Sequence, residues 1–466
     1  MKIFLRNIHL YLSLVSGLII AVVCLTGGIL VFEKELEQAW HPERYFVAAP
    51  AAATPALPLE RLTAAVKAYK PDAKITGMKV YADPTRTVEF NLAGAPGGPG
   101  GEQKGEGKNR GEGGQRGGEG RMEAGKAPQG EERRTEGGRG ESRGERGGKE
   151  GKGEGKGGKG GGEGGRGPVV FVNPYTAAVT GELNYRETFF FTMMALHRGM
   201  VGGPIGKLIV GVSTVMFLFI IITGIVLWWP ATRKAVKQRL QVKWSGGWKR
   251  LNHDLHIVLG FYSALFLFVF AFTGLAWSFE WFNKGIYAVT NSPMQRPEPP
   301  VSVVPGAAAV TAAPTPTDAL EPAATPEAAA PTPGLTPDAV LARARALAPA
   351  SVYYSLQLPK DPTGSIRVAT LRPDASYENA TDETYLDQYS GQVLSQQTYE
   401  QRSLGQRVRG MFKPVHTGSI WGWPSKIISA VVCVLGFTFP ITGTILWLNR
   451  LRKAWKKERK LAAAAV

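Results

Sequence analysis

The chain contains only two cysteines, Cys24 and Cys433, in 466 residues. Both lie inside long apolar runs, so they cannot form a disulfide framework for the segments outside these runs, and we expect them to be small packing residues. The sequence also lacks a Cys-x-x-Cys-His motif, a zinc-ligand motif, a nucleophile triad, a Walker loop and a nucleotide-binding fingerprint. These absences remove c-type haem attachment, covalent catalysis and nucleotide binding from the functions that the sequence supports.

Charged residues are nearly missing from four long apolar runs. Each run has at least about 20 residues of low charge, enough to cross a hydrocarbon core of about 30 Å as a helix. The first run, of about 25 residues, is longer than the apolar core of a secretory signal peptide, so we interpret it as a span. The sequence therefore predicts an α-helical integral membrane protein with a four-helix transmembrane bundle, at residues 8–32, 205–229, 256–280 and 425–448.

The net charge of +17 is concentrated in three segments. The N-terminus before the first span, a basic loop at residues 231–255 and a basic tail at residues 449–466 together carry +14. Four alternating spans place all three segments on one side of the membrane, and the positive-inside rule makes that side cytoplasmic. Membrane topology thus explains the charge, with both termini cytoplasmic and no nucleic-acid partner.

Two longer segments on the outer side, residues 55–185 and 336–405, each show a helical pattern followed by alternating strand patterns. They predict two small α+β periplasmic domains. Residues 94–167 are almost wholly Gly, Glu, Lys and Arg, and residues 101–167 hold 16 Lys/Arg against 13 Glu, so they predict a disordered insertion and not an anion site. Residues 293–333 form a Pro/Ala-rich linker that we expect to be flexible.

The two halves of the chain repeat in register, which predicts a tandem pseudo-two-fold repeat about an axis along the membrane normal. In the inward-running spans, offsets of 10, 26, 27 and 31 relate His197 to Lys207, Thr223, Gly224 and Trp228, and relate His416 to Lys426, Thr442, Gly443 and Trp447. In the outward-running spans, offsets of 17, 18 and 24 relate His9 to Thr26, Gly27 and Glu33, and relate His256 to Thr273, Gly274 and Glu280.

Four of the six histidines are fixed points of this repeat. The two-fold brings His9 toward His256 near the cytoplasmic side and His197 toward His416 near the outer side. A single histidine at a membrane interface is usually a polar anchor, but a symmetric set of four favours ligation, because ionisable groups at membrane depth are costly and imidazole pairs bind transition metals and haem iron. Two bis-His haem b groups, one per leaflet, satisfy all four residues, and another imidazole-binding metal ion remains an alternative.

The Thr-Gly pairs of the repeat fall at the levels of the histidine pairs. There, a glycine lets a flat cofactor approach the backbone, although small residues that only tighten helix packing explain them equally well. Gly202, Gly203 and Pro204 are expected to break the helix between His197 and the second span. The remaining candidates are weaker: His253, which assists or replaces His256; the surface residue His41; and five basic residues that are candidate partners for haem propionates, namely Arg6, Arg198, Lys207, Arg250 and Lys426.

At these residues the chain resembles the PepSY-associated transmembrane helix family. The matching features are His9, the Thr-Gly pairs, Leu196-His197-Arg198-Gly199, Leu255-His256, His416-Thr417-Gly418 and the turn Phe171-Val172-Asn173-Pro174-Tyr175-Thr176. The resemblance implies two PepSY-like periplasmic domains, the bacterial inner membrane and a link to iron uptake, where some members are haem-containing reductases of ferric siderophores. By position, it makes His9, His256, His197 and His416 the axial haem ligands. In the turn, Ala177-Ala178 departs from the family's common Thr-Gly.

Two hypotheses follow from the sequence. The first is a transmembrane electron-transfer protein, in which a cytoplasmic or membrane donor reduces the inner haem and a ferric siderophore or other ferric chelate takes the electron from the outer haem. The second is a non-enzymatic membrane-anchored PepSY scaffold or periplasmic protease regulator. The electron donor, the chelate and the oligomeric state are not identified by the sequence.

Overall fold

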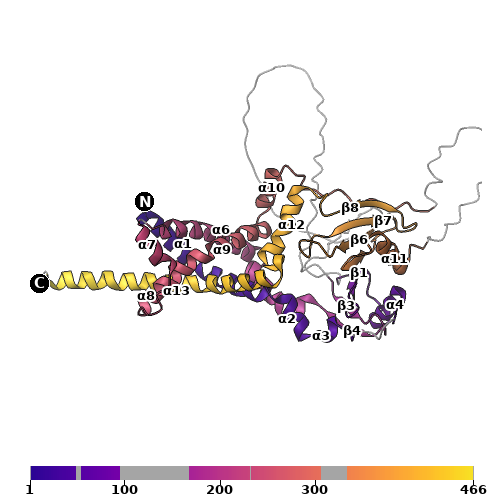
Figure 1. Ribbon diagram of the computed structural model, residues 1–466, viewed down its shortest axis with the longest axis horizontal. Helices are drawn as coiled ribbons and strands as arrows, with labels where there is room; N and C mark the ends of the chain where they lie inside the picture. Colours follow the sequence, from indigo (N-terminus) through magenta and orange to yellow (C-terminus); the bar gives the residue numbers. More distant parts are fainter. Residues whose placement is uncertain (1, 49–53, 95–166, 231, 306–332, 465–466) are drawn as a thin grey trace, which may run out of the picture.

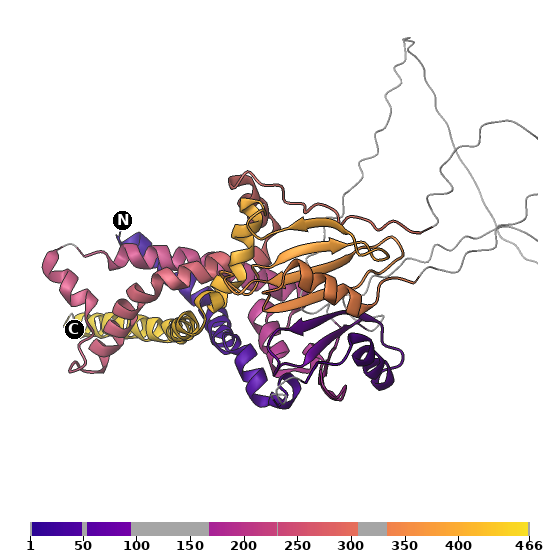
Figure 2. The same ribbon diagram turned by 45° about the vertical axis from the view of Figure 1, so that its right-hand side comes forward.

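The computed structural model describes residues 2–48, 54–94, 167–230, 232–305 and 333–464. These residues form a helical bundle with a β-sheet domain at one end, and both chain termini lie at the other end of the bundle (Figure 1). A second view shows the same separation between bundle and sheet (Figure 2). Residues 95–166 of the predicted insertion and residues 306–332 of the predicted linker lie outside the described residues.

Within the described residues, four helical stretches are long and apolar enough to cross a membrane. Helix α1 packs against α13 and α6, and α6 packs against α9. The predicted spans agree with these stretches in place, although α13 continues without a break through the basic tail. The stretches are α1 (Lys2–Leu30), α6 (Gly203–Trp228), the continuous run of α8 (Trp248–Asp254), η3 (Leu255–Leu259) and α9 (Gly260–Ser278), and α13 (Trp423–Ala464).

Helices α5 (Phe189–Gly199) and α12 (Leu404–His416) join the sheet to the second and fourth spans. Each begins with a hydroxyl cap, because Thr188 accepts from the Phe191 amide and Ser403 from the Gln406 amide. The expected break after α5 is confirmed: Met200 and Val201 have φ of 49° and 60° before α6 begins. Other short elements are α2 (Glu33–Trp40), α3 (Pro42–Tyr45), η2 (Tyr185–Glu187), α7 (Arg233–Leu240), α10 (Glu280–Val289) and η5 (Ser419–Trp421).

As far as the chain is described, the sheet has eight antiparallel strands in the order β4-β3-β2-β1-β5-β6-β7-β8. Helices α4 (Leu59–Tyr69) and α11 (Pro337–Leu347) contact each other and pack on the sheet. Fully buried Val66 and Val340 of these helices meet Met78, Phe90 and Leu356 of the strands in one core. The strands are β1 (Ile75–Tyr81), β2 (Val88–Leu92), β3 (Val169–Val172), β4 (Val179–Leu183), β5 (Tyr353–Gln357), β6 (Ile366–Leu371), β7 (Asp382–Leu386) and β8 (Val393–Gln397).

Pairing of β1 with β5, in which Met78 lies opposite Leu356, joins the two predicted outer domains into one sheet. The sequence predicts two separate units, because alternation of apolar residues shows which face of a strand is buried but not which edge finds a partner. Residues 302 and 303, placed in the linker from the sequence, also hydrogen-bond to this domain: the Ser302 amide donates to the Thr363 carbonyl and the Val303 amide to Asp387.

Candidate functional site

The four histidines singled out from the sequence lie in two pairs. His197 of α5 and His416 of α12 have their ring centroids 5.9 Å apart, with ring planes at 68°. We call this the outer pair, because both helices lead directly from the sheet. His9 of α1 lies against Gly224 of α6 and His256 of η3 against Gly443 of α13, and we call these two histidines the inner pair.

Each histidine faces the threonine of one Thr-Gly pair through its Nδ1 atom. The threonine hydroxyl donates its single proton to the carbonyl four residues earlier in its own helix, at distances of 2.7 Å for three of the four and 3.1 Å for Thr442. The hydroxyl oxygen can therefore only accept a hydrogen bond from Nδ1–H. The Nδ1–Oγ1 distances are 3.1 Å for His9–Thr223, 3.4 Å for His197–Thr26, 2.9 Å for His256–Thr442 and 3.0 Å for His416–Thr273.

A backbone carbonyl reinforces this arrangement at three of the histidines. The Nδ1 atoms of His9, His197 and His416 lie 3.1, 2.9 and 3.0 Å from the carbonyl oxygens of Ile220, Val23 and Phe270. Because a carbonyl only accepts, the hydrogen-bond network places the proton on Nδ1 and leaves Nε2 with a free lone pair. In the part of the chain that the structure describes, no hydrogen bond reaches Nε2 of any of the four rings.

The glycine of each Thr-Gly pair makes room for an imidazole ring. A Cβ atom on Gly27 would lie 2.9 Å from Cε1 of His197. The corresponding distances are 3.3 Å from Gly224 to His9, 3.3 Å from Gly274 to His416 and 3.2 Å from Gly443 to His256. From the sequence, two explanations of these glycines stood equal: they admit a flat cofactor, or they only tighten helix packing. In the structure the histidine itself fills the space, so threonine and glycine together orient the ring.

The donor set fits a haem, and the geometry of the outer pair supports this fit. Two imidazoles that bind one metal through Nε2 on opposite sides, with bonds of about 2 Å, have their ring centres about 6 Å apart, and the outer pair has 5.9 Å. Among the described residues, no group of three or more His, Cys, Asp or Glu side chains could hold a metal ion. Two nitrogen ligands per site match haem, in which the macrocycle supplies the other ligands.

His256 and His253 have different surroundings. His256 lies in the π-helical turn Leu255–Leu259, a type of turn often found at functional sites. Next to it, Asn252 is buried and donates to the Thr442 carbonyl at 3.2 Å. His253 is 48% exposed, and its Nδ1 lies 3.2 Å from Asp254. His256, and not His253, therefore occupies the place that corresponds to His9.

Two of the five basic candidates for propionate binding already have carboxylate partners. Lys426 pairs with Glu35 at 2.5 Å, and Arg250 pairs with Asp254 at 2.8 Å. Arg6, Arg198 and Lys207 have no ion pair within the described ranges. His41 is 43% exposed beside Glu43, as expected of a surface residue.

Two residues near the outer pair were not singled out from the sequence. The Trp277 ring lies 5.3 Å from that of His416, and the Arg409 guanidinium lies 5.1 Å from the Trp277 ring. Neither residue belongs to a motif. The repeat contained a signal for them, however. The equivalent positions in the first half are the apolar residues Phe190 and Leu30, so Arg409 and Trp277 break the symmetry of the two halves.

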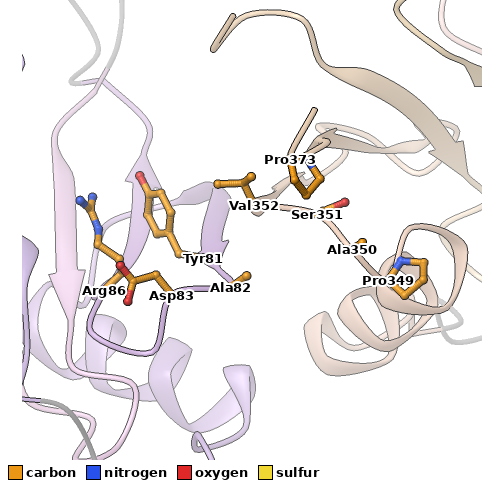
Figure 3. Close-up of a pocket in the computed structure, with 9 residues that line it drawn as sticks. All are labelled: Tyr81, Ala82, Asp83, Arg86, Pro349, Ala350, Ser351, Val352 and Pro373. Carbon is orange, nitrogen blue, oxygen red and sulfur yellow. The ribbon is translucent and has the colours of Figure 1, made fainter. Parts of the chain in front are cut away.

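The sheet domain has an open cavity of about 560 Å³ at the junction of its two halves. Tyr81, Asp83 and Arg86 line it from the first half, and Val352 and Pro373 face them from the second (Figure 3). All of its lining residues belong to the sheet domain, so the cavity is separate from the histidine pairs.

The fold and the histidine pairs define a helical membrane protein with an appended antiparallel sheet. The family described as PepSY-associated TM region matches residues 6–450, nearly the whole chain. The chain therefore belongs to this family, as the motifs predicted. No curated protein matches the chain significantly.

Proposed function

We propose that the protein is a di-haem transmembrane electron-transfer protein that reduces a ferric chelate, such as siderophore-bound iron, during iron uptake. The observation that carries this proposal is the shared environment of the four histidines. Each Nδ1 is committed to a threonine oxygen, and each Nε2 is left available. Two such pairs at different depths of one bundle suit a relay of electrons across a membrane.

The arrangement of charge supports the direction of this relay. The N-terminus, the α7–α8 segment and the C-terminal part of α13 lie at the end of the bundle away from the sheet (Figure 1). These are the basic segments, so the positive-inside rule favours a cytoplasmic location for them and a periplasmic location for the sheet. In a bacterial inner membrane, the inner pair would then face the donor and the outer pair the ferric chelate, with the halves related by a pseudo-two-fold axis.

When bound, haem supplies a one-electron iron(III)/iron(II) couple at each pair. His197 and His416 would hold the outer haem, and His9 and His256 would hold the inner one. With two imidazoles at each iron, the group would transfer electrons and would not bind oxygen. Thr26 and Thr273, with their partner carbonyls, fix the ring orientation and increase ligand basicity. The chelate therefore receives its electron by outer-sphere transfer, and its iron(III) becomes iron(II).

A scaffold or protease regulator is the second candidate, and one observation favours it. The cavity of about 560 Å³ is lined wholly by the sheet domain and does not involve the histidines. A binding role of that domain alone would need such a cavity and would not need the imidazole pairs.

The test uses the full chain purified from haem-replete cells and placed in nanodiscs. Dithionite-reduced protein is mixed without oxygen with a ferric hydroxamate chelate, and the haem α-band and trapped iron(II) are followed together. We expect the α-band to decay as one iron(II) forms per electron lost. The gallium(III) form of the same chelator, which cannot be reduced, serves as the control. Reduced haem that transfers no electrons to the ferric chelate would overturn the proposed reaction.

A further inference from the structure

Near the outer pair lies Arg409, a cation that has no carboxylate partner among the residues that the structure describes. Its Nε atom donates to Oδ1 of Asn283 at 2.7 Å, and its guanidinium lies over the Trp277 ring at 5.1 Å and near the Phe412 ring at 5.7 Å. Within the described ranges it forms no ion pair. This sets it apart from Lys426 and Arg250, whose charges are met by Glu35 and Asp254.

Asn283 fixes the position of this guanidinium. Its Nδ2 atom donates to the carbonyls of Ala276 at 2.6 Å and Phe279 at 3.2 Å, so Oδ1 must be the atom that faces Arg409. The Nε donor is thereby used, and within the described part of the chain the four N–H groups on the two terminal nitrogens remain for a ligand. A planar fork of this kind matches a carboxylate in a bidentate manner.

The surroundings of Arg409 favour an anionic partner. Burial lowers the pKa of Arg409, while Tyr287 acts in the opposite direction. No carboxylate of α9 or α10, the elements that pack on α12, pairs with it: Glu280 pairs instead with Lys284 and is 70% exposed. A partly buried cation without an opposite charge is costly, and a bound anion removes that cost.

Arg409 lies on the same helix as His416, seven residues earlier, which places both on one face two turns apart. Trp277 lies between them, with its ring 5.3 Å from the His416 ring. The Arg409 guanidinium and the His416 ring therefore contact the same tryptophan ring.

This group of residues occurs in only one half of the chain. The offsets that relate the two halves place Phe190 at the position of Arg409, Leu30 at that of Trp277 and Leu36 at that of Asn283. All three equivalents are apolar, although the histidines, threonines and glycines are kept in both halves. The shared architecture of the repeat therefore does not require Arg409, Trp277 and Asn283. Their role is specific to one side of the outer site.

We propose that Arg409, positioned by Asn283 over Trp277, binds a carboxylate at the outer histidine pair. This inference rests on the proposed function, since one source of the carboxylate is a propionate of the haem that His197 and His416 would hold. An acidic group of the ferric chelate has the same chemistry and is the other source. The experiment separates the two.

The first measurement is the rate at which haem leaves the outer site for apomyoglobin, made in a His256→Ala background that leaves only the outer haem. We expect Arg409→Gln to increase this rate about tenfold, the scale of loss for an outer-shell partner, and Arg409→Lys to increase it less. The matched control is Arg407→Gln, since Arg407 is an exposed arginine of the same helix that lies over Tyr399 at 5.7 Å. If the ligand is a propionate, the Arg409→Gln variant and its parent should lose haem dimethyl ester, which has no free carboxylate, at the same rate.

The second measurement is the affinity of the same variants for an anionic and for a neutral gallium(III) chelate. Unchanged haem loss together with about tenfold weaker binding of the anionic chelate alone would assign the carboxylate to the chelate, which also supports the anion site. The proposal is overturned if both readouts match Arg407→Gln, or if Arg409→Gln and Arg409→Lys speed haem loss above the parent rate to the same extent. Protein that contains no haem at all contradicts the proposed function instead, and the chelate measurement still tests Arg409.

Discussion

Thr442 Oγ1 lies 2.9 Å from Nδ1 of His256, and the same hydroxyl donates its proton to the Thr438 carbonyl at 3.1 Å. The threonine is therefore an acceptor that holds Nδ1–H and leaves Nε2 without a proton. Thr442→Val keeps the shape of this side chain and removes the acceptor. We expect the affinity of the inner site for haem to fall about 10- to 100-fold, as for other outer-shell partners of metal-binding histidines.

The control for this substitution is Thr444→Val on the same helix. Thr444 is exposed and donates only to the Pro440 carbonyl, at 2.7 Å. Haem titration of apo-protein, monitored at the Soret band, measures both variants. Equal haem affinities for the two variants would show that the Thr442 contact does not orient a ligand.

The glycines beside the rings provide a graded test. A Cβ at Gly27 would lie 2.9 Å from His197, whereas a Cβ at Gly274 would lie 3.3 Å from His416. Gly27→Ala should therefore displace its ring more than Gly274→Ala. We expect the low-spin signal of the outer haem in electron paramagnetic resonance to shift in that order. Gly260→Ala, where a Cβ meets nothing within 4 Å, should leave the signal unchanged, and a shift of equal size in all three variants would contradict the packing argument.

Much of the fold could be predicted from the sequence, because the deciding patterns are local. Long uncharged runs identify the spans, and the alternation in residues such as Val88–Leu92 identifies strands whose inward positions are buried. Pairing of β1 with β5 could not be predicted, since it depends on which strand edges meet after both units have folded.

The candidate site was predictable only in part. Equal offsets from the histidines revealed the pairs, because the repeat preserves them. The role of the Thr-Gly pairs could be assigned only from the structure. A glycine at the level of His197 makes room either for a cofactor or for the imidazole ring of His197. Arg409 could not be predicted from the sequence, because no motif contains it. Its distinctive feature among the described residues is that it has no carboxylate partner, and this is visible only in the packing around Trp277.

Ala177 is strained in the turn between β3 and β4. Its φ is 60°, in the left-handed region, and the corresponding turn between β7 and β8 has Gly391 with φ 71°. A residue with a Cβ loses about 1–2 kcal/mol in this region, and Ala177→Gly removes that penalty. Glycine has more conformational entropy in the unfolded state, which opposes the gain, so the net stabilisation of the hairpin should be at most about 1 kcal/mol. Hydrogen exchange of the β3 and β4 amides measures this change. Ala178→Gly, which relieves no such strain, should not increase their protection.

Glu383 makes the sheet sensitive to acid. Burial raises the pKa of its carboxyl, but Arg367 at 2.7 Å and Arg402 at 3.0 Å outweigh this effect and hold the pKa below its ordinary value. A lowered folded-state pKa contributes stability in full above the unfolded value of about 4.3, and that contribution is lost as the pH falls through the folded value.

Glu383→Gln should therefore destabilise the β6–β7 region at neutral pH by about 3 kcal/mol, since two guanidinium groups lose their counter-charge. The variant should also lack the decrease in stability that the native protein shows as the pH falls below the pKa of Glu383 in the unfolded state. Hydrogen exchange of β6 and β7 amides as a function of pH tests both effects. The control is Glu400→Gln, because Glu400 pairs with Arg372 at the exposed surface. A Glu383→Gln variant with unchanged acid sensitivity would contradict this assignment.

The most direct test of the central claim is the haem content of the purified full chain and its histidine variants, measured by the pyridine haemochrome method. We predict two haem b groups per native chain with low-spin Soret and α bands, because two imidazole pairs are available. His197→Ala and His416→Ala should each remove the outer haem, His9→Ala and His256→Ala should each remove the inner haem, and His253→Ala should retain both. Native protein without a Soret band after expression with ample haem, or haem lost with His253→Ala and kept with His256→Ala, would contradict the account.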